Sequence, residues 1–86
     1  MVRVAYVKWL DAESYSGPRL VSNTKNLKGS EVESAGILLS QDNKAIRIAQ
    51  GVWAGDDSNA GFMAREIEVI PQKYVISKQI FEVKEK

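Results

Sequence analysis

The residue types that most often carry out catalysis are missing from this chain. Its 86 residues include neither histidine nor cysteine, which removes the commonest general base, the commonest metal ligand and the thiol nucleophile. Ser34 and Ser40 could supply a hydroxyl nucleophile, but the sequence places no obvious base beside either of them. Because no nucleophile–base pair can be named, we predict no catalytic residue, no cofactor and no enzymatic activity.

Oxygen ligands for a cation are concentrated in the segment Asp56-Asp57-Ser58-Asn59. Its adjacent carboxylates lack the alternating one-three-five spacing of a calcium-binding loop. The nearby glycines, Gly51, Gly55 and Gly61, are spaced too irregularly to form a phosphate-binding loop. The sequence therefore favours a solvated loop tip here and predicts no metal site.

Two alternatives involve negatively charged ligands. In the first, Arg47 or Arg65 binds the phosphate of a small ligand, such as a nucleotide, enclosed between the subunits of an oligomer. In the second, a small barrel binds single-stranded nucleic acid through aromatic stacking and basic grooves. Twelve Lys and Arg residues oppose eleven Asp and Glu residues, for a net charge of +1, and no basic cluster is present. This balance argues against nucleic acid, which normally binds to a basic stripe.

Aromatic side chains give the stronger indication of function. We expect Trp9 and Phe81 in the core, whereas Tyr15, Trp53 and Phe62 lie in or beside two long loops. A rigid ring buries much area at small entropic cost, so these three are predicted contacts for a protein partner. The alternative is that the three rings fold under the loops and plug the ends of the fold.

The elements that would position these residues are strands. Runs rich in β-branched and aromatic residues predict strands at about 2–11, 32–41, 44–52, 65–70 and 75–83. Asp42-Asn43 tolerates positive φ and predicts a tight hairpin, and Gly36 predicts a bulge or a close backbone approach. In the fourth strand we expect Ile67 and Val69 to point inward, with Pro71 ending the strand.

Length and composition favour one domain spanning residues 1–83, followed by a frayed tail at 84–86. A hydrophobic content of 44% with 27% charged residues is typical of a globular chain. Five short strands with two long loops, at 11–31 and 53–64, predict a small, partly open, all-β barrel.

Framework residues suggest a relationship to viral proteins. Four segments resemble small uncharacterised proteins of tailed phages and prophages: Val7-Lys8-Trp9-Leu10-Asp11-Ala12, Ser34-Ala35-Gly36-Ile37-Leu38-Leu39, Ala45-Ile46-Arg47-Ile48-Ala49 and Val69-Ile70-Pro71, with Ile76 and Ile80 following. The resemblance implies a barrel and a viral origin, and it implies no particular activity. We therefore expect a non-enzymatic binding module of phage or prophage origin that engages a host protein.

The segment Ile70-Pro71-Gln72-Lys73-Tyr74-Val75 resembles the turn that ends the Src-homology-3 (SH3) barrel. In that family the proline and tyrosine contact Pro-rich peptides together with other aromatic side chains. The resemblance implies an SH3-like fold and adds Tyr74 to the predicted partner-binding residues.

Location and assembly are the remaining expectations. Charged residues interrupt the apolar ones in residues 1–10, and no apolar run approaches the ~20 residues that span a bilayer. We therefore expect a cytoplasmic protein without membrane contact. An open barrel leaves strand edges, and residues 2–11 are apolar on both faces, so we also expect a homodimer or other homo-oligomer in which this strand takes part.

Overall fold

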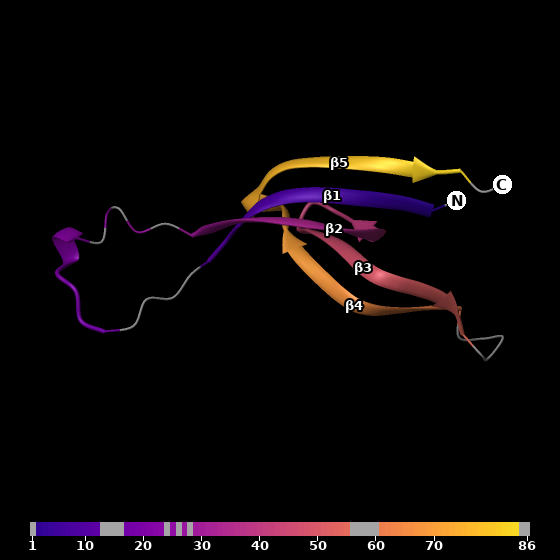
Figure 1. Ribbon diagram of the computed structural model, residues 1–86, viewed down its shortest axis with the longest axis horizontal. Helices are drawn as coiled ribbons and strands as arrows, with labels where there is room; N and C mark the ends of the chain where they lie inside the picture. Colours follow the sequence, from indigo (N-terminus) through magenta and orange to yellow (C-terminus); the bar gives the residue numbers. More distant parts are fainter. Residues whose placement is uncertain are drawn as a thin grey trace.

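The chain folds into a single antiparallel sheet, seen in a computed structural model that describes residues 2–12, 17–23, 25, 27, 29–55 and 61–84. Its strands are β1 (Val2–Asp11), β2 (Ser30–Gln41), β3 (Ala45–Ala54), β4 (Phe62–Pro71) and β5 (Val75–Val83). Two short 3₁₀ turns, η1 (Val21–Asn23) and η2 (Gln72–Tyr74), complete the described elements. The spatial order is β4-β3-β2-β1-β5 (Figure 1), which confirms the predicted all-β class with five strands.

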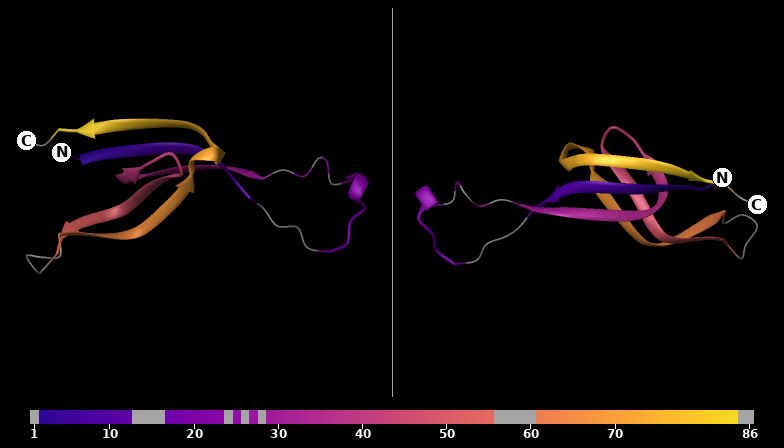
Figure 2. Two further views of the ribbon diagram at one scale, coloured as in Figure 1. Left: turned by 180° about the vertical axis from the view of Figure 1, so that it is seen from behind. Right: turned by 45° about the horizontal axis from the view of Figure 1, so that its top comes forward.

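The sheet is bent but open. Among the described residues β4 pairs only with β3, and β5 pairs only with β1, so the two edge strands do not join. The β3–β4 hairpin runs at an angle to β1 and β5 (Figure 2), while η1 lies well away from the sheet. In the described part of the chain, no helix is long and apolar enough to cross a bilayer.

One face of the sheet, the inner face, carries the hydrophobic core. Alternate residues of β1 point to this face, as the period of two in a strand requires. The buried core cluster consists of Ala5, Val7, Trp9, Leu38, Ile46, Ile48 and Ile70, with Val32, Val75 and Ile80 packed against it. The indole Nε1 of Trp9 donates a hydrogen bond of 3.1 Å to Ser34 Oγ, so its polar atom is satisfied inside the core.

The opposite, outer face carries side chains that the sequence placed inside. Ile67 and Val69 are 54% and 56% exposed, so the prediction that they point inward is wrong. Ile70 faces the core as the register partner of Ile46, and alternation then places Val69 and Ile67 outside. Phe81 is 52% exposed, contrary to its predicted core position, because the neighbouring Ile80 takes the inner side of β5.

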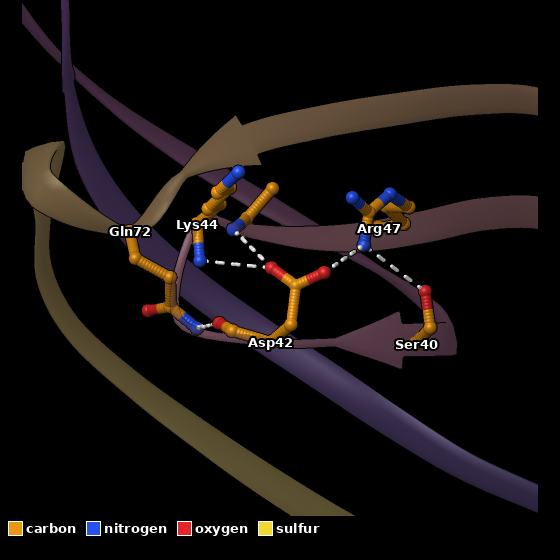
Figure 3. A network of polar contacts seen from close by, with 6 residues as sticks. Ser40, Asp42, Lys44, Arg47 and Gln72 are labelled. Carbon is orange, nitrogen blue, oxygen red and sulfur yellow. Dashed lines mark hydrogen bonds and ion pairs between the residues drawn. The ribbon is translucent and has the colours of Figure 1, made fainter.

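The predicted hairpin at Asp42-Asn43 is confirmed, but the turn is stabilised by a side chain and not by residues with positive φ. Among the described residues, Glu66 is the one residue other than glycine that has a positive φ, at 53°. Neither Asp42 nor Asn43 therefore adopts the left-handed backbone conformation. The Asp42 side chain instead organises the turn, its Oδ1 accepting hydrogen bonds from the backbone N–H groups of Lys44 (2.8 Å) and Ala45 (2.9 Å; Figure 3). Such local side-chain bonds are what make aspartate favourable in turns.

The β3–β4 hairpin is longer than predicted. Trp53 and Phe62, assigned from the sequence to a loop at 53–64, belong to β3 and β4. Pairing of Ala54 with Phe62 extends the ladder, and the Gly55 N–H donates to the Gly61 carbonyl oxygen at 2.8 Å. The loop is therefore confined to residues 55–61, and Asp56-Asp57-Ser58-Asn59 lies outside the described residues. After β5, Lys84 is exposed, and residues 85–86 of the predicted frayed tail are also outside them.

Candidate functional site

A pocket of about 500 Å³ opens where three parts of the sheet come together. These are the start of β1, the second half of β2 and the end of the β3–β4 hairpin where β3 ends and β4 begins. Six of its seven lining residues are apolar and one is cationic: Val2, Arg3, Ile37, Leu38, Leu39, Val52 and Phe62. Its volume lies in the range of about 300–1,000 Å³ that is usual for ligand sites. The pocket can hold an apolar group and, through the Arg3 guanidinium, a negatively charged one beside it.

A shift in the β2–β3 register explains why this end of the sheet stays open. Leu38 is buried in the core, whereas Leu39 is more than one-third exposed. The β2–β3 register shifts between Leu38 and Ser40, which is the signature of a β-bulge. A bulge bends its strand and interrupts the ladder, so β2 turns away and leaves apolar side chains uncovered.

Phe62 is the predicted partner-binding residue that lines the pocket, and 80% of it is exposed. Trp53 lies close by, because the register pairs Trp53 with Met63 and Ala54 with Phe62. Alternation along the strands places Trp53 and Phe62 on opposite faces of the hairpin. The two rings therefore flank the hairpin end, and Phe62 is the one directed to the pocket.

Tyr74, another predicted aromatic contact, is not part of this site. Tyr74 lies in η2, beyond the opposite end of the ten-residue strand β4, about 30 Å of extended chain from Phe62. Its ring has the Lys73 ammonium 5.2 Å from the centroid, a weak cation–π contact at the surface. Tyr15 lies outside the described residues.

The two arginines proposed as phosphate ligands lie on the outer face and are separate from each other. Arg47 Nη1 contacts Asp42 Oδ2 at 3.2 Å and donates to Ser40 Oγ at 3.3 Å (Figure 3). The Arg65 side chain lies over Gly51, so close that a Cβ built on Gly51 would fall 2.9 Å from the Nε of Arg65. Gly51 and Arg47 are four residues apart, about 13 Å along β3, so the two guanidinium groups do not form one clamp.

Shifted pKa values mark structural contacts away from the pocket. Backbone hydrogen bonds from Ala45 and Lys44, and then the bond from Arg47, hold the pKa of Asp42 below its ordinary value. The Tyr6 hydroxyl donates to Glu33 across β1 and β2, and this bond, with burial and the Glu33 charge, raises the pKa of Tyr6. Both shifts follow from hydrogen bonding, which stabilises the form that makes the bond.

The two serines considered as nucleophiles have hydrogen-bond donors, and no base, as the partners that the structure shows. Ser34 accepts its hydrogen bond from an indole and Ser40 accepts its bond from a guanidinium, and neither donor can act as a general base at neutral pH. Within the described part of the chain no three acidic side chains are grouped as metal ligands.

With this geometry established, we compared the chain with known proteins. No protein-family model matches it, and neither the curated proteins nor the solved structures give a significant match.

Sequence reasoning found one lining residue of the pocket, Phe62, and missed the others. The run Ile37-Leu38-Leu39 was the available signal, because three consecutive apolar residues cannot all face one side of a strand. Arg3 and Val2 carried no such signal. They line the pocket because β1 ends beside the bend of β2, which is a tertiary feature.

Proposed function

We propose that the protein is a non-enzymatic binding module whose pocket accepts an apolar side chain of a protein partner. The observation that carries this proposal is the exposed ring of Phe62 at the wall of a pocket whose other lining residues, apart from Arg3, are aliphatic. Aromatic anchors beside apolar pockets are the usual energetic centres of protein interfaces. Arg3, the charged lining residue, favours an acidic residue next to the apolar anchor of the partner.

The end of the β3–β4 hairpin supports the same interpretation. Trp53, Met63 and Arg65 follow one another across the outer face there, and the first two are nearly half exposed. Tryptophan, methionine and arginine are enriched in protein interfaces relative to the rest of the surface. A partner seated in the pocket would extend over the hairpin end and contact Trp53.

We further propose that the sheet is an open variant of the SH3-like barrel and that the protein derives from a phage or prophage. The strand order and the 3₁₀ turn η2 between β4 and β5 support the first part. The framework resemblance to phage proteins supports the second and favours a host protein as partner, met in the host cytoplasm. Binding through the pocket differs from the family's peptide site, since Pro71 and Tyr74 lie at the other end of β4.

Selection from a random peptide library tests the pocket. We expect the immobilised protein to enrich peptides that combine a large apolar residue with an acidic one, and Phe62→Ala to weaken their binding at least about tenfold. Arg3→Gln should remove the preference for the acidic residue, while Tyr74→Ala, far from the pocket, should change neither. Peptides that bind Phe62→Ala as well as the parent protein would contradict the proposal.

A small amphipathic anion is a second candidate ligand, because the pocket volume suits one and Arg3 can bind its charge. A panel of nucleotides and short fatty acids should then raise the melting temperature of the parent protein and leave that of Arg3→Gln unchanged. If no compound in the panel raises the melting temperature of the parent protein, a small anion is excluded as the ligand. The peptide selection then tests the remaining proposal.

A further inference from the structure

The strand β5 forms one open edge of the sheet, beyond β1 (Figure 1), and among the described residues it pairs with β1 alone. Its register with β1 is regular over residues 77–83, from the pair of Lys8 with Ser77 to the pair of Val2 with Val83. In an antiparallel ladder the N–H and C=O groups of every second residue point to the free side of an edge strand. This stretch, about 23 Å long, can therefore accept another strand.

Two side chains of opposite charge, Lys78 and Glu82, lie on the same face of β5, because four residues separate them. Both are exposed, and neither belongs to an ion pair within the described part of the chain. The Lys78 ammonium donates a hydrogen bond of 3.2 Å to the neutral Oε1 of Gln41, and it keeps two further N–H donors. Ile80 lies midway between the two charges and packs against the core. The edge of β5 thus carries a positive charge, an apolar residue and a negative charge at equal spacing.

A second β5 strand can pair with this edge so that the charges of both copies are matched. If a two-fold axis passes beside Ile80, antiparallel pairing puts position 78 of each copy opposite position 82 of the other. Lys78 of one copy then faces Glu82 of the second copy, and this pair occurs twice, once on each side of the two Ile80 residues. Opposite charges directly across antiparallel strands stabilise the pairing, and like charges destabilise it. In this register β5 is therefore complementary to itself.

The neighbouring registers lack this match. Residues opposite each other share a face of the sheet, so the axis must pass beside a residue. An axis beside Gln79 would place Lys78 opposite Ile80, and an axis beside Phe81 would place Lys78 opposite Lys84. Of the three registers, the one centred on Ile80 is the one that pairs charge with opposite charge.

The same register covers the exposed ring of Phe81. Phe81 of one copy stands opposite Gln79 of the second copy, so the two Phe81 rings become diagonal neighbours on the outer face. Diagonal neighbours lie about 7–8 Å apart, within reach of aromatic side chains. Phe81 is 52% exposed in the single chain. Contact between the two rings would bury apolar area in addition to the backbone hydrogen bonds and the charge pairs.

We propose that two copies of this chain join through their β5 strands, antiparallel about an axis beside Ile80, into one continuous sheet. The charge complementarity of this register identifies a second copy as the occupant of the edge. A two-fold contact of this kind is closed, because each copy uses its β5 edge once. The expected contact thereby moves from β1 to β5, since β1 is paired on both sides, with β2 and with β5. The dimer does not depend on the proposed binding function, because residues 77–83 do not line the pocket.

Exchange of the two charges tests the dimer by sedimentation equilibrium. We expect twice the chain mass of 9.6 kDa for the parent protein. Lys78→Glu and Glu82→Lys each oppose like charges on both sides of the axis, so each should raise the dissociation constant of the dimer at least about tenfold. An equimolar mixture of the two variants restores both charge pairs and should associate as the parent does. Glu68→Lys is the matched control, because it makes the same charge change on β4 at the other edge and should leave the dissociation constant unchanged.

Three results would overturn the proposal. The first is a parent protein with a single chain mass at the highest attainable concentration. The second is a pair of charge variants that each dimerise as tightly as the parent. The third is a mixture of the two variants that associates no more tightly than either variant alone. If a charge reversal disrupts the fold, as far-ultraviolet circular dichroism would show, Lys78→Gln and Glu82→Gln test the same pairs with milder changes.

The pocket proposal and the dimer proposal can fail separately. Phe62→Ala should stay dimeric, because Phe62 lies on β4 and not on β5. Lys78→Glu should bind the selected peptides as the parent does, because Lys78 does not line the pocket. Loss of peptide binding with the dimer intact would contradict the pocket alone, and loss of the dimer with peptide binding intact is the result expected of Lys78→Glu.

Discussion

Gly36 of β2 lies against the backbone of Ala49 on β3, so closely that a Cβ at position 36 would fall 2.8 Å from the Ala49 carbonyl oxygen. The sequence predicted a bulge or a close backbone approach at this glycine, and the structure shows the close approach. The obstacle is backbone rather than a flexible side chain, so the two strands would have to move apart. We expect Gly36→Ala to destabilise the protein by about 1–3 kcal/mol in urea unfolding.

Gly51 provides the control for this substitution. A Cβ at position 51 would meet the side chain of Arg65, which can rotate away. We expect Gly51→Ala to change the free energy of unfolding by less than about 0.5 kcal/mol. Equal effects of the two substitutions would show that the β2–β3 spacing is not what requires a glycine at position 36.

Neighbouring residues on β4 test the assignment of the two faces. Ile70 is 0% exposed and Val69 is 56% exposed, although the sequence analysis expected Val69 to point inward. Ile70→Ala should lower the free energy of unfolding by about 2–5 kcal/mol, since it leaves a cavity in the core. Val69→Ala should cost less than about 0.5 kcal/mol. Urea unfolding of both variants measures the difference, and the reverse order would place the core on the other face.

The strands were largely predictable from the sequence, whereas their faces were less so. Alternation of Ile46 and Ile48 with Arg47 fixed the inner side of β3, because a charged residue separates two apolar ones. In β4 the apolar residues Ile67, Val69 and Ile70 include an adjacent pair, and either could have faced the core. Only the register with β3, a long-range property, selects Ile70.

The hydrogen bond between Trp9 and Ser34 should contribute a measurable coupling energy across β1 and β2. The 3.1 Å bond satisfies the indole N–H in a buried position. We expect a double-mutant cycle of Trp9→Phe and Ser34→Ala to give a coupling of about 0.5–1.5 kcal/mol in equilibrium unfolding. The cycle subtracts the loss of packing that each single substitution causes, so the remaining energy is that of the interaction between the two side chains. A coupling near zero would mean that the N–H finds water in solution.

Acidification should weaken the turn at Asp42. Its hydrogen bonds lower the folded-state pKa below the ordinary value of 3.8, so the ionised side chain stabilises the native state. This contribution is fully present above pH 3.8 and is lost as the pH falls through the lower folded-state pKa. Asp42→Asn, whose side chain does not titrate, should therefore lose less stability than the parent on acidification. Identical pH profiles from chemical denaturation would contradict this prediction.

The candidate pocket was harder to predict than the fold. Phe62 was identified because an aromatic residue near a loop has no automatic core partner. The aliphatic lining depends on the register shift between Leu38 and Ser40, a property of the β2–β3 pairing for which the run Ile37-Leu38-Leu39 was the available local signal. Tyr74 was added through a six-residue resemblance, and the length of β4 separates it from Phe62.

Glu66 has a left-handed backbone conformation, with φ at 53°, near the middle of the edge strand β4. A foreign strand that pairs with an edge needs an uninterrupted line of extended residues, and this conformation divides the exposed edge of β4 into two short stretches. Open-ended growth of one chain onto the next, the first step toward fibres, is therefore hindered at this edge.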